Sequence, residues 1–309
     1  MKYNETNFDG KGEVFMKRLI FKGAGVAIVT PFTEEGINFP ELGRMIDDQI
    51  KNGTDAIVIA GTTGEAATMD DAEHKEAIKF AAEHTKKRVP VIAGTGSNDT
   101  AYAVQLSQYA ESVGADGLLL VTPYYNKCTQ KGLVEHFTKI ADSVNIPCIL
   151  YNVPSRTGLS IKVSTYAELA KHPNIVAVKE ANGDLSSILR LRHAVGDELT
   201  VYSGNDDQIV PILSIGGMGV ISVLSNVAPK ETHDICQLYF DGKVEEAAKL
   251  QIAYTDLIDA LFCETNPIPA KTAMRLMGYA AGPLRLPLCE MEPENLKKLE
   301  TAMKAHNLI

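Results

Sequence analysis

Eight short apolar runs that alternate with helix-like stretches constrain the fold of this chain more than any other feature. The stretches between them carry apolar residues at three- and four-residue intervals, as an amphipathic helix does. Strand followed by helix, repeated eight times, predicts a parallel sheet, and eight such units close into a TIM (β/α)8 barrel of about 250 residues. The runs are GVAIVT (25–30), AIVIAG (56–61), PVIAGT (90–95), GLLLVTP (117–123), CILYNVP (148–154), IVAVKEA (175–181), TVYSGND (200–206) and MGVISV (218–223).

An open doubly wound sheet is the other arrangement that such alternation permits. Its dinucleotide-binding form carries the fingerprint G-x-G-x-x-G after a strand. The best candidate, AGTGSND, has Gly94 and Gly96 but Asp99 in place of the third glycine. The sequence therefore favours the closed barrel.

The pattern changes at about Asn226, after which no clear strand follows. Residues 231–262 have the pattern of helix, turn and helix, and residues 294–306 that of a final helix. We therefore predict three parts. They are an N-terminal extension (1–20), a barrel that carries the active site (21–225) and an all-helical C-terminal domain (226–309).

Composition and charge exclude several classes of function. The formal net charge is −9, which disfavours nucleic acid as a partner because such binding depends on Lys and Arg at phosphates. No apolar run reaches the roughly 18 residues of a membrane span, and the polar N-terminus lacks the apolar core of a signal peptide. Five scattered cysteines without a C-x-x-C pair indicate reduced thiols. Together these features predict a cytoplasmic protein.

One lysine ends a run that otherwise has the pattern of a buried strand. In NIVAVKEANGD, four apolar residues precede Lys179 and Asn-Gly-Asp follows shortly after. Active sites of TIM barrels lie at the carboxyl ends of the strands, where desolvation favours a neutral amine over an ammonium. A neutral amine is a nucleophile suited to Schiff-base formation with a carbonyl. The competing interpretation is a structural ion pair with Glu180 or Asp207.

Other strand ends carry groups that suit a keto-acid substrate. Tyr151 can transfer protons at a carbinolamine, although a core tyrosine is the alternative. The planar guanidinium of Arg156 suits a carboxylate, although surface arginines are common. GTTGE (61–65) offers two hydroxyls and a glycine-relaxed backbone for an anion. Tyr124 and Tyr125 lie in a loop, where aromatic residues also anchor interfaces.

Metal sites and hydrolytic triads have no basis in the sequence. The seven histidines mostly fall in helical stretches, and none forms H-E-x-x-H or another ligand spacing. No G-x-S-x-G elbow is present on which a Ser-His-Asp triad could be built. We therefore expect no metal.

Six motifs, in this order, resemble the dihydrodipicolinate synthase family: GTTGE, VTPYYN, YNVPSRTG, VAVKEA, SGND and NPIPAK. The resemblance covers roughly Phe21 to the C-terminus. It implies a (β/α)8 barrel with a helical C-terminal domain, and a 4-hydroxy-tetrahydrodipicolinate synthase activity in diaminopimelate and lysine biosynthesis. Such an enzyme condenses pyruvate with L-aspartate 4-semialdehyde. No metal or organic cofactor is implied, because the imine itself is the electron sink.

The resemblance also assigns catalytic roles to residues at matching motif positions. Lys179 would form the imine with pyruvate, and the resulting enamine would attack the aldehyde. Tyr151, Thr62 and Tyr125 would form a proton relay. Tyr125 would reach the active site of a neighbouring subunit across a tight interface, which implies a homo-oligomer and, as is common in the family, a tetramer built as a dimer of dimers.

Four further residues match substrate-binding positions of the family. Thr63 would bind the pyruvate carboxylate, and Arg156 would bind the carboxylate of the semialdehyde at the site entrance. Gly204 and Ile221 would contribute backbone groups near the imine.

The chain departs from the family at positions where lysine-inhibited relatives bind lysine. Ala66, Asp71 and Tyr102 stand where serine, histidine and glutamate are usual. Loss of the glutamate removes a charge-assisted bond to the ligand's ammonium, worth about 1.5–3 kcal/mol. We therefore predict weak or absent inhibition by lysine, although Asp71 offers a substitute charge. The remaining positions match, namely His74, Asn98 and Tyr124.

Two other functions remain open on the sequence alone. N-acetylneuraminate lyase and keto-deoxy-sugar aldolases share the barrel, the lysine and the YN-x-P motif, but Arg156 favours an aldehyde that bears a carboxylate. A non-catalytic barrel that binds a keto acid is the second alternative, although the lysine, tyrosine and threonines are all present.

Overall fold

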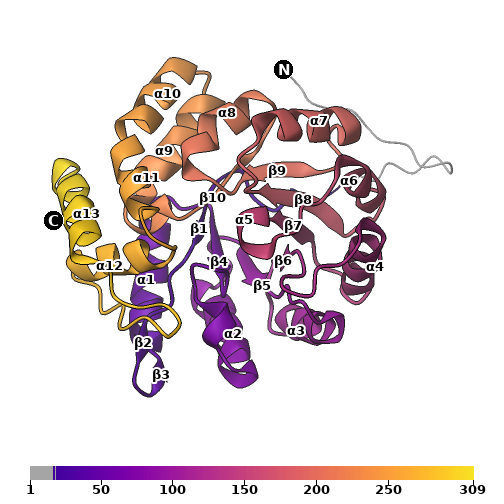
Figure 1. The fold of residues 1–309 in the computed structure, drawn as a ribbon, viewed down its shortest axis with the longest axis horizontal. Helices are drawn as coiled ribbons and strands as arrows, with labels where there is room; N and C mark the ends of the chain where they lie inside the picture. The colour runs from indigo at the N-terminus through magenta and orange to yellow at the C-terminus, as the bar shows by residue number, and fades with distance from the viewer. Residues whose placement is uncertain (1–16, 18) are drawn as a thin grey trace.

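The computed structural model describes residue 17 and residues 19–309, and its centre is a closed barrel of eight parallel strands (Figure 1). The predicted TIM (β/α)8 fold is confirmed. In order around the barrel, the strands are β1 (Gly23–Ala27), β10 (Gly219–Ser222), β9 (Thr200–Ser203), β8 (Ile175–Glu180), β7 (Cys148–Asn152), β6 (Gly117–Val121), β5 (Val91–Gly94) and β4 (Ala56–Ile59).

Each of the eight apolar runs forms one of these strands, and the largest difference in bounds is in the first. The run predicted at 25–30 begins at Gly23 and ends at Ala27. Ile28 N still donates to the Val58 carbonyl of β4 (3.2 Å), but the next two residues bond outside the barrel sheet. Val29 N donates to Asn226 Oδ1 (3.0 Å), and Thr30 Oγ1 donates to the Gly64 carbonyl (2.8 Å). The chain therefore leaves the barrel early, toward the loop that follows β4.

Helices cover the outside of the barrel, and side-chain caps begin several of them. Asp70 accepts a hydrogen bond from Glu73 N (2.8 Å), and Thr129 accepts one from Gly132 N (3.1 Å), which satisfies backbone donors that a helix start leaves free. The covering helices are α1 (Phe39–Lys51), α2 (Asp71–Thr85), α3 (Thr100–Ser112), α4 (Gln130–Ala141), α6 (Val163–Leu169), α7 (Leu185–Val195), α8 (Ile209–Ser214) and α9 (Pro229–Phe240).

Apolar side chains fill the interior of the barrel, as in other closed barrels of this size. Val58, Ile92 and Ile149 are fully buried there. Phe21 and Tyr202 stack at 4.2 Å, and the Tyr202 hydroxyl donates to the Phe21 carbonyl (2.6 Å). This packing leaves the carboxyl ends of the strands as the polar side of the barrel.

Four helices follow α9, namely α10 (Val244–Ala253), α11 (Thr255–Leu261), α12 (Ile268–Leu276) and α13 (Pro293–Ala305). The second helix predicted within 231–262 is divided at Tyr254 into α10 and α11. Helix α13 packs on α11 and α12 at the edge of the molecule (Figure 1). Tyr279, which follows α12, donates its hydroxyl to Asp48 Oδ2 of α1 (3.0 Å).

The predicted boundary between residues 225 and 226 remains a prediction. Helix α9 lies beyond it but packs on the barrel, because Ile235 and Cys236 are buried against Ala24 of β1 and Val220 of β10. The predicted extension over 1–20 falls largely on residues 1–16 and 18, which lie outside the described residues. Across the described chain, no helix has the length and apolar character needed to cross a bilayer.

Candidate active site

A cavity of about 190 Å³ opens where the carboxyl ends of the strands meet. This volume is below the roughly 300–1,000 Å³ typical of pockets for drug-sized ligands, so it suits a small ligand such as a keto acid. Six of the eight predicted site residues line the cavity: Thr62, Thr63, Tyr151, Arg156, Lys179 and Gly204. Tyr125 and Ile221 do not line it.

Lys179 and Tyr151 are neighbours inside the barrel. They are paired in register on β8 and β7, and Lys179 Nζ lies 4.4 Å from the centre of the Tyr151 ring. Lys179 is only 6% exposed. Among the described residues, no carboxylate forms an ion pair with Lys179, and its amine donates no hydrogen bond. The ion-pair interpretation therefore has no support, and the amine is directed into the cavity.

A hydrogen-bonded cluster lies behind this pair, on the outer face of the same strands. Asn152 and Glu180 form the next register pair, and Glu180 Oε1 accepts from Asn152 Nδ2 (2.5 Å) and from the Tyr166 hydroxyl (2.8 Å). Burial raises the pKa of Glu180 to about 7, although both hydrogen bonds lower it. Because residues alternate between faces along a strand, this cluster fixes the register that directs Tyr151 and Lys179 inward. No local pattern in the sequence indicates this cluster.

The GTTGE loop after β4 is a compact turn with free donors. Glu65 N donates to the Thr62 carbonyl (3.1 Å), and Gly64 N donates to the Gly61 carbonyl (3.1 Å). Within the described chain, the N–H groups of Thr62 and Thr63 donate to no acceptor. Successive free backbone N–H groups form a concavity that binds anions, so the loop can receive the carboxylate of a small acid.

Arg156 reaches the cavity from α5 (Pro154–Thr157), a single turn that begins with proline. Its Nη2 donates to the Asn266 carbonyl (2.8 Å), and Asn266 Nδ2 donates to Thr63 Oγ1 (3.0 Å). Asn266 therefore joins the two predicted carboxylate-binding residues. It lies in NPIPAK, one of the six motifs that carry the family resemblance, for whose residues no role was predicted.

The two predicted backbone contributors differ in their positions. Gly204 N donates to the Glu180 carbonyl (2.7 Å), so only the Gly204 carbonyl remains for a ligand. A Cβ at Gly204 would lie 2.7 Å from Ala181 Cβ, which explains why glycine occupies this position. Ile221 is fully buried in β10 among the interior residues, and its predicted role stays a prediction.

Tyr125 lies outside the cavity of its own chain. Its side chain is 92% exposed, and its φ of 68° is in the left-handed region, which a tyrosine adopts at a cost. Asn98 Nδ2 donates to the Tyr124 carbonyl (3.2 Å) and Asn126 Nδ2 to the Asn98 carbonyl (3.0 Å), which tethers the loop. Intramolecular contacts therefore hold the backbone and leave the ring free.

The residues at the positions where relatives bind lysine make contacts within this chain. Asp71 Oδ2 accepts from Lys75 Nζ (2.7 Å), and hydrogen bonds from Lys75 and from the Tyr102 hydroxyl lower the pKa of Asp71. His74 Nε2 bonds the Gly94 carbonyl (2.9 Å). Asp71, the substitute charge, thus already has partners.

No group of three or more metal-ligating side chains was found in the part of the chain that the structure describes.

The fold and the cavity together define a class of protein, a TIM barrel with a lysine amine beside a tyrosine phenol at the carboxyl ends of its strands. The chain matches the model of the dihydrodipicolinate synthetase family over residues 20–306. It belongs to this family.

Individual relatives agree with this assignment. A protein of Clostridium perfringens named 4-hydroxy-tetrahydrodipicolinate synthase is 58% identical over 290 residues, which cover 94% of this chain and 100% of that protein. The crystal structure of dihydrodipicolinate synthase from Aquifex aeolicus has a TM-score of 0.92 at 45% identity, covering 93% of this chain and 99% of that one. A chloride-inhibited dihydrodipicolinate synthase from Acinetobacter baumannii, crystallised with pyruvate, has a TM-score of 0.90 at 41% identity, with coverages of 93% and 99%.

Proposed function

We propose that this chain is a lyase that condenses pyruvate with L-aspartate 4-semialdehyde, the reaction of a 4-hydroxy-tetrahydrodipicolinate synthase. The observation that carries the proposal is the buried Lys179 amine, which lies beside the Tyr151 ring without a carboxylate partner among the described residues. Family membership and the names of the relatives support it.

The chemistry begins with attack of Lys179 Nζ on the keto carbon of pyruvate. The resulting carbinolamine loses water to give an imine, and the imine loses a methyl proton to give an enamine. The enamine carbon then bonds to the aldehyde carbon of the semialdehyde. Attack of the semialdehyde's amino group on the imine carbon closes the ring and releases the lysine.

Two separate anion sites would hold the two substrates. The free N–H groups of Thr62 and Thr63 suit the pyruvate carboxylate. Arg156 commits Nη2 to Asn266 and retains other donors that can bind the carboxylate of the semialdehyde. Asn266 lies between these sites and would fix the distance between them.

The proton transfers would use Tyr151, Thr62 and Tyr125. Tyr151 and Thr62 line the cavity, and their hydroxyls form no hydrogen bond among the described residues, so both are free to exchange protons. Tyr125 is exposed in its own chain and would enter the cavity of a second subunit. This arrangement requires a dimer, and we infer a tetramer built from two such dimers.

A cytoplasmic location is part of the proposal, and the five free cysteines support it. The chief competing function is an aldolase that joins pyruvate to a sugar aldehyde. Arg156 disfavours it because a neutral polyhydroxylated sugar offers no carboxylate to the guanidinium.

The experiment measures pyruvate consumption with aspartate 4-semialdehyde and, separately, with a neutral sugar aldehyde. We expect rapid consumption only with the semialdehyde. Arg156→Ala should raise the KM for the semialdehyde more than that for pyruvate, because the carboxylate of the semialdehyde loses the guanidinium that would bind it. Faster turnover with the sugar aldehyde would instead assign the chain to the competing function.

A further inference from the structure

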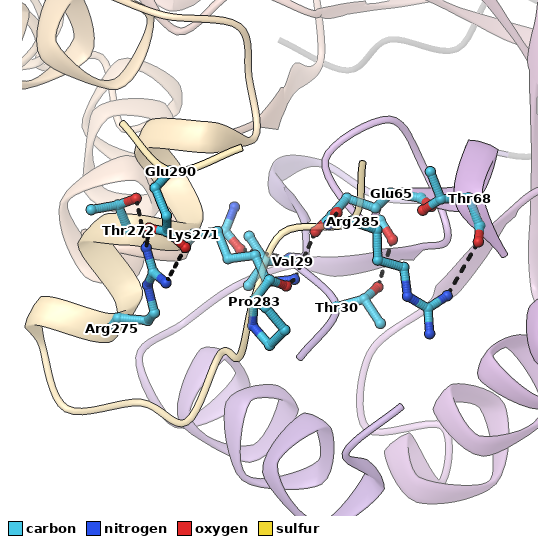
Figure 2. Close-up of polar contacts among 12 residues, drawn as sticks. Val29, Thr30, Glu65, Thr68, Lys271, Thr272, Arg275, Pro283, Arg285 and Glu290 are labelled. Atoms are coloured by element: carbon cyan, nitrogen blue, oxygen red, sulfur yellow. Dashed lines mark hydrogen bonds and ion pairs between the residues drawn. The ribbon is translucent and has the colours of Figure 1, made fainter. Parts of the chain in front are cut away.

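A buried ion pair joins the loop after β4 to the C-terminal helices (Figure 2). Lys271 Nζ of α12 lies 2.7 Å from Glu65 Oε1, and the two side chains are 0% and 1% exposed. Figure 2 shows Lys271 on the C-terminal part of the chain and Glu65 on the barrel side. Neither residue lines the cavity, so the ion pair has no direct contact with a substrate bound there.

Both charged groups have further partners. Lys271 Nζ donates to the Pro283 carbonyl (2.8 Å) and lies 4.3 Å from the centre of the Phe32 ring. Glu65 Oε2 accepts from Arg285 N (3.0 Å). The ion pair is therefore held from the barrel side and from the segment between α12 and α13.

The ion pair is one of two contacts between the same two chain segments. Three residues, 63–65, face six residues, 266–271. Thr63 Oγ1 accepts from Asn266 Nδ2 at one end (3.0 Å), and Glu65 pairs with Lys271 at the other. Lys271 N donates to the Pro267 carbonyl (2.9 Å), a hydrogen bond within residues 266–271 that holds the two ends of this segment together. Two contacts fix the relative orientation of the segments, whereas one would leave them free to pivot.

Each of these segments also contacts a residue proposed to act on substrate. Glu65 N donates to the Thr62 carbonyl (3.1 Å), so the backbone of Thr62 moves with Glu65. The Asn266 carbonyl accepts from Arg156 Nη2 (2.8 Å), so Arg156 moves with the start of α12. The ion pair thus fixes the spacing between the two predicted anion sites.

A buried ion pair is a weak source of stability, because desolvation of the two charges offsets their attraction. Burial lowers the pKa of Lys271 to about 8 despite the opposing effect of Glu65. A buried pair can instead constrain geometry, since removing one partner leaves the other charge buried and uncompensated. An ion pair near the active site that fixes the geometry of the chain around it, without stabilising the fold, is suited to hold substrate-binding groups in place.

We propose that Glu65 and Lys271 are positioning residues that hold Thr62, Thr63 and Arg156 in place around the imine. The inference rests on the proposed function. Misplacement of a substrate by about 1 Å can cost 10²-fold in rate. Loss of the ion pair should therefore lower kcat and raise the KM values, while imine formation at saturating pyruvate continues.

The test is the double variant Glu65→Gln with Lys271→Met. It removes both charges together, which for a buried pair is often neutral or stabilising, and glutamine can still accept from Arg285 N. We expect an unchanged or higher melting temperature, full labelling of Lys179 by pyruvate and borohydride, and at least a roughly tenfold lower kcat per labelled site. The single variant Lys271→Met strands a buried carboxylate and should lose folded protein.

Arg275→Met is the matched control, because Arg275 lies on the same helix and pairs with Glu290 at the surface. It should retain the unmodified protein's rate. A folded double variant with unchanged kcat and KM would overturn the positioning role. A rate loss that disappears when activity is expressed per labelled Lys179 would also overturn the positioning role. Failure of the unmodified protein to condense the two substrates would overturn the proposed function instead.

Discussion

Tyr151 and Lys179 hold the same register position on neighbouring strands, and the Lys179 amine lies 4.4 Å from the centre of the Tyr151 ring. The next register pair, Asn152 and Glu180, is hydrogen-bonded on the opposite face. A shift of one residue in either strand would exchange the faces, placing an amide or a carboxyl in the cavity. The strand pairing itself therefore places an amine beside a phenol.

Replacing Tyr151 by phenylalanine should remove proton transfer and keep the ring beside Lys179. We expect kcat to fall by about 10²–10⁴-fold, the usual contribution of general acid–base catalysis, while borohydride still traps pyruvate on Lys179. Steady-state rates and mass spectrometry measure the two effects. Tyr109→Phe, in α3 and outside the cavity, should retain the full rate. A fully active Tyr151→Phe would exclude its hydroxyl from the relay.

Subunit mixing tests whether Tyr125 acts across an interface. Tyr125→Phe and Lys179→Ala should each be nearly inactive alone. A mixed dimer, however, contains one intact site, made of Lys179 from one subunit and Tyr125 from the other. After denaturation and refolding together, random pairing at a symmetric interface should restore roughly a quarter of the normal rate.

The two other outcomes of the mixing experiment have distinct meanings. No recovery from well-folded mixed dimers would show that Tyr125 acts within its own chain. Full activity of Tyr125→Phe alone would remove the tyrosine from the relay.

Lysine should inhibit this protein weakly or not at all. Tyr102 stands where lysine-inhibited relatives carry the glutamate that binds the ligand's ammonium, and Asp71 is already paired with Lys75. Initial rates with and without millimolar lysine measure the effect. Tyr102→Glu should introduce or strengthen inhibition, because it restores a carboxylate. Potent inhibition of the unmodified protein would show that another group compensates.

The buried carboxyl of Glu180 should make stability depend on pH. Burial raises its pKa to about 7 from the ordinary 4.5 of a glutamate, so the folded state keeps a proton that the unfolded state loses. The stability that this proton contributes is complete below pH 4.5 and is lost as the pH rises through about 7. The unmodified protein should therefore lose stability relative to Glu180→Gln as the pH rises from acidic to neutral.

Denaturant unfolding at a fixed protein concentration measures this difference. Between about pH 5 and about pH 8, the free energy of unfolding should shift by about 2 kcal/mol in favour of Glu180→Gln. The Tyr166 hydroxyl donates to Glu180, so Tyr166→Phe serves as a control that removes a partner without removing the carboxyl. A difference that does not change with pH would place the carboxyl in a more hydrated setting.

Local patterns were sufficient to predict the architecture of this chain. The strands were recognisable because parallel strands buried on both faces form continuous apolar runs, and the helices because their apolar residues recur every three or four positions. Lys179 was recognisable for the same reason, since a charged side chain directly follows such a run. The division at Tyr254, however, was missed because both parts have the same helical periodicity.

Contacts between distant parts of the chain could not be predicted in this way. Glu65 and Lys271 are 206 residues apart, and nothing local to either residue indicates the other. Asn266 follows the barrel by some forty positions and still lines the cavity. The exposure of Tyr125 was likewise invisible to periodicity, because it depends on the left-handed backbone of a loop.

Trapping the imine tests the central claim most directly. The protein is treated with pyruvate and borohydride, its intact mass is measured, and its peptides are mapped. We predict a mass gain of one reduced pyruvate per chain, located on the peptide that contains Lys179, in the unmodified protein and in the double variant Glu65→Gln with Lys271→Met. Lys179→Ala should gain no mass. A folded, unmodified protein without an adduct, or with an adduct on another lysine, would contradict the account.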